Sequence, residues 1–126
     1  METSVSAEVE NLLANKPSSL AGIGANDGIV SGKIRILLDP KDINQLEAGE
    51  ILVTRFTDTG WSHAFGSLKG LITETGGVLC HASIVAREFG IPTIVCATQA
   101  TEKLKTGMNV TMNGTTGEIT IQKSGC

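Results

Sequence analysis

The most informative stretch of the sequence runs from Thr73 to Pro92 and reads TETGGVLCHASIVAREFGIP. Small and apolar residues recur in its second half at helical spacing, at Ala82, Val85, Ala86 and Phe89. Gly90 suits the left-handed position that ends many helices, and a proline two residues later cannot continue one. The stretch therefore predicts a helix that begins near His81 and ends before Gly90.

His81 lies at the predicted start of this helix, shortly after the glycine pair Gly76 and Gly77. The first N–H groups of a helix lack internal partners and carry the positive end of its dipole, which favours anions. The glycines allow the backbone to approach an anion closely. A protonated imidazole is disfavoured there, whereas a neutral, nucleophilic imidazole and an anionic phosphoimidazole are favoured. The position suits a histidine that accepts a phosphoryl group, and an exposed histidine with a packing role is the alternative.

Outside this helix, short β-branched and apolar runs separated by turn residues predict mostly strands. The runs lie at 29–38, 50–54, 71–73, 93–97, 108–112 and 118–121, and the glycine-rich loop 113–117 joins the last two as a hairpin. Short helical turns are expected at 42–46, capped by Asp42, at 61–68 and at 101–104. Many short strands with one clear helix favour a β-rich α/β domain with a helical layer over a doubly wound sheet.

The chain of 126 residues is long enough for one domain. We expect a flexible tail or linker over residues 1–19, because Pro17 and the two serines after it end any helix there. The domain itself is expected over residues 20–122, followed by a short C-terminal tail at 123–126. Three glycines lie near its start, and Asn26, Asp27 and Gly28 together predict a turn.

Charge and composition argue against several classes of function. The net charge is −3 and aromatic residues make up 3% of the chain, which disfavours nucleic acid as a partner. No apolar run approaches the roughly 18 residues that span a bilayer, and residues 1–16 lack a signal-peptide pattern. We therefore expect no membrane binding and a cytoplasmic location. The three cysteines, Cys80, Cys96 and Cys126, fit reduced thiols better than disulfides or a zinc site.

The string GGVLCHASIVAREFGIP, residues 76–92, resembles the swivelling phosphohistidine domain of PEP-utilising enzymes. These enzymes include phosphoenolpyruvate synthase, pyruvate phosphate dikinase and rifampin phosphotransferase. Further stretches resemble other landmarks of the family, namely GIVSGKIR at 28–35, GEILVT at 49–54, TDTGW at 57–61 and the ending at 107–117. The resemblance implies a compact, β-rich fold of three layers, β/β/α.

The resemblance also implies a function as a phosphoryl carrier. His81 would accept a phosphoryl group from ATP or PEP chemistry on a partner domain and pass it to a small molecule such as pyruvate or a drug hydroxyl. The partners would be an ATP-grasp nucleotide-binding domain and an acceptor-binding domain, in cis or in trans. Mg²⁺ and ATP or PEP would bind to those domains, so this domain would bind no cofactor itself and would not complete the reaction alone.

Several residues near His81 are candidates for supporting the phosphate. Gly76 and Gly77 would let the backbone approach the phosphate closely, and Cys80 matches a cysteine found in some family members. Ser83 would donate to a phosphate near the first turn, or it is a surface residue. Arg87 would meet a partner domain, or it pairs with Glu74 or Glu88.

Two other functions stay open at the level of sequence. The first is a non-catalytic interaction module that keeps the swivel fold and works by binding. The second is a small hydrolase that uses Cys80 or a metal at His81. We interpret His63, the other histidine, as incidental, because the family that the sequence resembles commonly carries other residue types in this stretch. A metal site formed by His63 and His81 would need further ligands that the sequence does not suggest.

Overall fold

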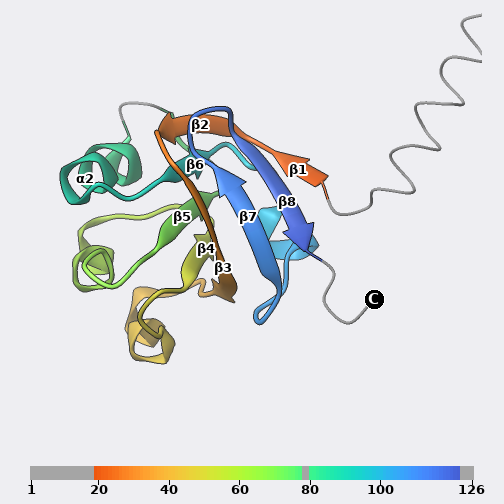
Figure 1. The fold of residues 1–126 in the computed structure, drawn as a ribbon. Coiled ribbons are helices and arrows are strands. Elements are labelled where there is room, and N and C mark those ends of the chain that lie inside the picture. The colour runs from red at the N-terminus through yellow and green to blue at the C-terminus, as the bar shows by residue number, and fades with distance from the viewer. Residues whose placement is uncertain (1–18, 78–79, 123–126) are drawn as a thin grey trace, which may run out of the picture.

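The fold is a β-rich α/β domain built around one strongly curved sheet (Figure 1). The computed structural model describes residues 19–77 and 80–122. Within them, eight strands form a sheet in the order β1-β8-β7-β3-β4-β5-β6-β2. The strands are β1 (Ser19–Ala21), β2 (Ile23–Asn26), β3 (Ile29–Ile36), β4 (Ile51–Thr54), β5 (Gly70–Thr73), β6 (Thr93–Val95), β7 (Asn109–Asn113) and β8 (Glu118–Gln122). The helices are η1 (Pro40–Gln45) and η2 (Thr59–Ala64), both 3-10, and α2 (His81–Phe89) and α3 (Ala100–Lys103).

Strand β3 belongs to both halves of the sheet. Its residues 29–33 pair antiparallel with β7, and its residues 34–36 pair parallel with β4. One half therefore contains β1, β8, β7 and the start of β3, all antiparallel. The other half contains the end of β3 with β4, β5 and β6 in parallel, and β2 antiparallel at its edge. The change of partner along β3 folds the sheet over on itself.

The first two strands close the sheet. β1 pairs with β8 and β2 pairs with β6, so the strands at opposite ends of the sheet are consecutive in the chain and separated only by Gly22. The Gly22 amide donates to the carbonyl of Gly117 at 2.8 Å. A Cβ atom at Gly114 would overlap the carbonyl oxygen of Asn26, so only glycine allows the backbones to approach this closely.

Alternating side chains of the parallel strands build two separate cores. Ile51 and Val53 of β4 point into a core between the two halves of the sheet, while Leu52 points to the opposite face. β5 repeats the pattern with Ile72 and Leu71. The second core is completed by residues from the helical side, namely Leu37, Trp61, Phe65, Ala82, Ala86 and Ile91. Two cores separated by one sheet make a β/β/α arrangement of three layers, which confirms the predicted fold class.

The structure confirms most predicted strands to within a few residues and adds β1 and β2, which the sequence did not predict. These two strands have only three and four residues and contain or flank glycines, so they show no alternating pattern. The predicted helical turns at 42–46 and 61–68 are 3-10 helices at Pro40–Gln45 and Thr59–Ala64. The cap of the first is Asp39, not Asp42, because the Asp39 carboxylate accepts from the Lys41 amide and Pro40 fits the first helical position.

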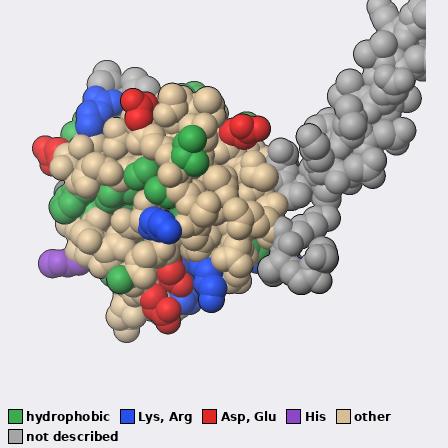
Figure 2. Space-filling model, viewed as in Figure 1, with side chains coloured by type: hydrophobic (Ala, Val, Ile, Leu, Met, Phe, Trp, Pro, Cys, Tyr) green, Lys and Arg blue, Asp and Glu red, His purple; other side chains and the backbone are tan. Residues whose placement is uncertain are grey.

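The predicted tails lie almost entirely outside the described residues. Of the segments 1–19 and 123–126, only Ser19 is described, and it begins β1. In the described part of the chain, no helix is long and apolar enough to cross a membrane. On the face shown in Figure 2, acidic and basic side chains are interspersed without a large patch of one sign.

We predict that Gly114→Ala destabilises the domain, because the new Cβ meets backbone of β2 that cannot turn aside. Overpacking of this kind costs about 1–3 kcal/mol. The measurement is the free energy of unfolding in urea. Gly66→Ala is the matched control, because a Cβ there meets nothing within 4 Å. Equal stabilities of the two variants would show that the close approach does not hold the sheet together.

Candidate active site

The candidate site lies at the carboxyl ends of three neighbouring parallel strands. Thr57 follows β4, the pair Gly76 and Gly77 follows β5, and Cys96 follows β6. Backbone hydrogen bonds extend the ladder beyond the strands, since the Glu74 amide donates to the Thr54 carbonyl at 3.1 Å. The Ala97 amide likewise donates to the Thr73 carbonyl at 2.9 Å. Loops that are far apart in the sequence therefore meet at one edge, as is common in sheets with parallel strands.

Helix α2 carries His81 as its first residue. Its N-cap residue, Cys80, is extended, and Gly90 takes the left-handed conformation with φ 70° that ends the helix. These bounds confirm the predicted helix and its glycine stop. The Asn26 side-chain amide donates to the Ile91 carbonyl at 2.9 Å, which ties the far end of the helix to β2. The end of the helix opposite to His81 is therefore anchored to the sheet.

Two contacts hold the His81 ring. Nδ1 lies 2.9 Å from the hydroxyl oxygen of Thr57, which is buried. The Phe65 ring meets the imidazole edge-on, with ring centroids 6.0 Å apart and an interplanar angle of 69°. Within the described residues, Nε2 makes no hydrogen bond. Nδ1 is thus occupied, and Nε2 is the nitrogen left for chemistry on this partly exposed ring.

The contact with Thr57 has a chemical consequence. When Nδ1–H donates to the Thr57 hydroxyl oxygen, Nε2 carries the lone pair and is a nucleophile. Sequence reasoning did not identify Thr57 as a site residue. The signal was present, because Thr57 begins the stretch TDTGW that resembles a family landmark, but a contact across 24 positions has no local signature.

Ser83 organises the loop that precedes the helix. It is fully buried, so the interpretation as a surface residue is wrong. Its hydroxyl donates to the carbonyl of Gly77 at 2.6 Å and lies 3.4 Å from Sγ of Cys80. A role of Ser83, Gly76 and Gly77 in supporting phosphate stays a prediction, and for Ser83 it would be exerted through the shape of this loop.

Cys80 is half-buried beside His81. Burial alone would raise the pKa of its thiol, and this is the largest single effect. The Ser83 hydroxyl and the surrounding backbone amides of Ser83, Gly77 and Ala82 together outweigh it, so the pKa of Cys80 lies below its usual value. The positive end of a helix dipole also stabilises a thiolate at such a position.

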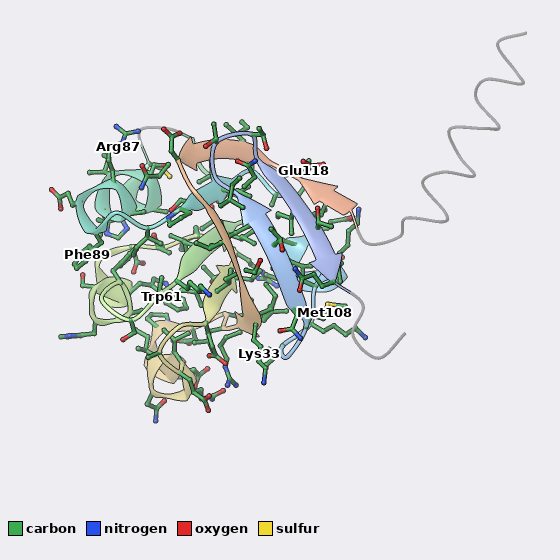
Figure 3. All side chains as sticks on the ribbon, viewed as in Figure 1. Lys33, Trp61, Arg87, Phe89, Met108 and Glu118 are labelled. Atoms are coloured by element: carbon green, nitrogen blue, oxygen red, sulfur yellow. The ribbon has the colours of Figure 1, made fainter. Side chains whose placement is uncertain are left out.

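Arg87 does not pair with Glu74. The Glu74 carboxylate instead accepts from the amide and the hydroxyl of Thr101, at 2.7 and 2.6 Å. Arg87 donates to the Ala25 carbonyl of β2 at 3.4 Å, and no ion pair of Arg87 occurs among the described residues, with Glu88 or any other acid. Arg87 is exposed on α2 (Figure 3), and its contact with a partner domain stays a prediction.

Phe89 departs from the predicted packing face of α2. It is 54% exposed, and it stacks on Phe65 at a centroid distance of 6.1 Å. Figure 3 shows Phe89 at the outer margin of the domain, whereas Trp61 lies in the interior. His63 is exposed on η2. The described ranges contain no group of three or more His, Cys, Asp or Glu residues placed to hold a metal ion.

Comparison with known proteins gives the family and close relatives. Residues 46–117 match the family described as "PEP-utilising enzyme, mobile domain". Rifampicin phosphotransferase of Bacillus cereus is 43% identical over 112 residues, covering 89% of this chain and 12% of the relative. Phosphoenolpyruvate synthase of Aquifex aeolicus is 45% identical over 97 residues, covering 77% of this chain and 11% of the relative. The chain therefore spans about an eighth of the length of the relatives it matches.

Among solved structures, a chain of aconitase X from Thermococcus kodakaraensis has a similar fold. The TM-score is 0.61 at 22% sequence identity, and the match covers 83% of this chain and 98% of the other. An identity this low shows a shared fold and nothing about chemistry.

We predict that Thr57 sets the tautomer of His81. Two-bond proton–nitrogen correlation spectra at a pH where the imidazole is neutral should show the proton on Nδ1 in the wild-type protein. We expect this tautomer because the Thr57 hydroxyl oxygen lies 2.9 Å from Nδ1 and can accept its proton. Thr57→Ser keeps the hydroxyl and should keep this tautomer. Thr57→Val removes the acceptor and should let the Nε2–H form appear. An unchanged spectrum for Thr57→Val would show that the contact does not control the ring.

Proposed function

Because the chain belongs to the family of mobile domains of PEP-utilising enzymes, we propose that it is a phosphoryl carrier whose acceptor atom is Nε2 of His81. The observation that carries the proposal is the contact between Thr57 and Nδ1 at the start of α2. With Nδ1–H donating to the Thr57 hydroxyl oxygen, the lone pair of Nε2 is the nucleophile. The positive end of the helix and the glycine loop before it favour the charge of a bound phosphoryl group.

The proposed transfer has two steps. The lone pair of Nε2 attacks phosphorus in ATP or PEP, a P–N bond forms, and the P–O bond to the leaving group breaks with its electron pair on the departing oxygen. In the second step an oxygen of the acceptor attacks phosphorus, and the P–N bond breaks with its electron pair returning to Nε2. An acceptor that is a hydroxyl group releases its proton to solvent. Thr57 retains the proton on Nδ1 throughout, so that the ring leaves and returns as a neutral imidazole.

Phosphoryl transfer depends mainly on positioning and on electrostatic stabilisation of the transferred group. The chain's own contribution is a ring held between Thr57 and Phe65, on a helix whose far end is tied to β2. We propose that ATP or PEP and Mg²⁺ bind to partner domains, in cis or in trans. One would be an ATP-grasp nucleotide-binding domain, and another would bind a small-molecule acceptor such as pyruvate or a drug hydroxyl.

The first test is phosphorylation of His81. The protein is incubated with ATP and Mg²⁺, or with PEP, and a family enzyme from which the mobile domain has been removed. Intact mass and phosphorus NMR should show one acid-labile, base-stable phosphoryl group. His81→Ala should abolish it, and His63→Ala is the matched control because His63 is the other histidine and is exposed.

Retention of the phosphoryl group by His81→Ala would overturn the assignment of the acceptor. If wild-type protein stays unphosphorylated while the partner enzyme still phosphorylates its own mobile domain, a non-catalytic interaction module would take the place of the carrier.

The second test separates positioning from chemistry. Thr57→Val should lower the rate of phosphorylation by roughly 10- to 100-fold, since an unfixed tautomer weakens the nucleophile. Thr57→Ser should stay close to the wild-type rate. Rates are measured by quenched-flow mass analysis under single-turnover conditions, and equal rates for Val and Ser would argue against the role of Thr57.

A further inference from the structure

Two cysteines of the chain meet at one glycine. The thiol of Cys96 donates to the carbonyl oxygen of Gly76 at 2.7 Å. A Cβ atom at Gly76 would lie only 2.8 Å from Sγ of Cys80. Both sulfur atoms therefore contact the same residue, one from the start of α2 and the other from the end of β6, although they are 16 positions apart in the sequence.

The missing side chain of Gly76 keeps the space beside Cys80 open. Any larger residue would place Cβ against Sγ, and the φ of 119° at Gly76 is a conformation that other residues rarely adopt. Cys96 also has a positive φ, of 57°, which is uncommon for a residue that is not glycine. This backbone conformation accompanies the turn of Cys96 toward Gly76 at the end of β6.

Both thiols are accessible enough to react. Cys80 and Cys96 are free and partly exposed, so a small reagent can reach them. The lowered pKa of Cys80 raises the share of its thiolate near neutral pH, and the thiolate is the form that attacks a disulfide. Cys96, whose thiol contacts the Gly76 carbonyl beside Cys80, would take the second, resolving step.

From this juxtaposition we propose that Cys80 and Cys96 form a reversible disulfide that stops the site from working. The Cys80 thiolate attacks a low-molecular-weight disulfide, forming a mixed disulfide and releasing one thiol. Cys96 then loses its proton to solvent, gives up its hydrogen bond to Gly76 and attacks Sγ of Cys80. The protein disulfide forms, a second small thiol leaves, and two protein thiols are oxidised while one small disulfide is reduced.

The disulfide would displace His81, the residue that follows Cys80 in the chain. Cys80 is the N-cap of α2, and its sulfur lies beside Ser83, which holds the loop through Gly77. Bonding to Cys96 draws Cys80 away from Ser83 and shifts the first turn of the helix, on which His81 sits. The consequence for phosphorylation rests on the proposed function, whereas formation of the disulfide does not.

The experiment uses the full chain with Cys126→Ser, which leaves the pair as the only cysteines. The protein is incubated with oxidised glutathione and analysed as intact mass without reductant and by peptide mapping. We expect a link between Cys80 and Cys96 with no glutathione attached, reversed by dithiothreitol. Cys96→Ser should instead trap one glutathione on Cys80, and Cys80→Ser should react more slowly. A mixed disulfide that persists on Cys80 while Cys96 is present would overturn the proposal.

The second measurement is the rate of phosphorylation of the oxidised and the reduced protein by the same partner enzyme. We expect a loss of at least about tenfold on oxidation, with recovery after reduction. The double variant Cys80→Ser, Cys96→Ser has neither thiol of the pair, so its rate should be the same before and after the treatment. Full activity of the linked protein would overturn the inhibitory role. Failure of the reduced protein to accept phosphate would count against the carrier function alone, because mass analysis reads the disulfide independently.

Discussion

The parallel pairing of β4, β5 and β6 is the constraint on which the rest of the molecule depends. Parallel strands all end at the same edge, so the segments that follow them are brought together however far apart they are in the sequence. Here the ladder continues past the strands through the bonds of Glu74 and Ala97, which fixes the loops as well as the strands. His81, Thr57 and both thiols meet because of this geometry, and the two cores on either side of the sheet keep it rigid.

Local features of the fold could be predicted from the sequence, and features that depend on distant pairing could not. Helix α2 carries its own signals, an apolar face and a glycine stop, and both are confirmed. The short strands β1 and β2 have no such signal, since they are defined by what they pair with. The same distinction holds within the site. His81 can be recognised in the sequence beside its glycine pair. The contacts of Thr57 with His81 and of Cys96 with Gly76 join residues that are distant in the sequence, and they form only when the strands pair.

The fold and the chemistry of this domain are separable. A chain of aconitase X has a similar fold at low identity. The candidate site of this chain is a set of side chains at one edge of the sheet, with a histidine at a helix start, a hydroxyl group hydrogen-bonded to its Nδ1 and a loop anchored by Ser83. Substitutions at these few positions would remove the proposed chemistry while the layered fold stays the same.

The pairing of β1 with β8 has a mechanical consequence. Ser19 lies opposite Thr120, so the chain enters and leaves the domain through adjacent antiparallel strands (Figure 1). Polypeptide attached at either end of the domain would therefore leave it from the same region of its surface. Rotation of the domain about that region would change the length of either attached segment little, while the residues farthest from it would move the greatest distance. A domain attached through adjacent ends can rotate as a rigid body between separate binding sites without an internal conformational change.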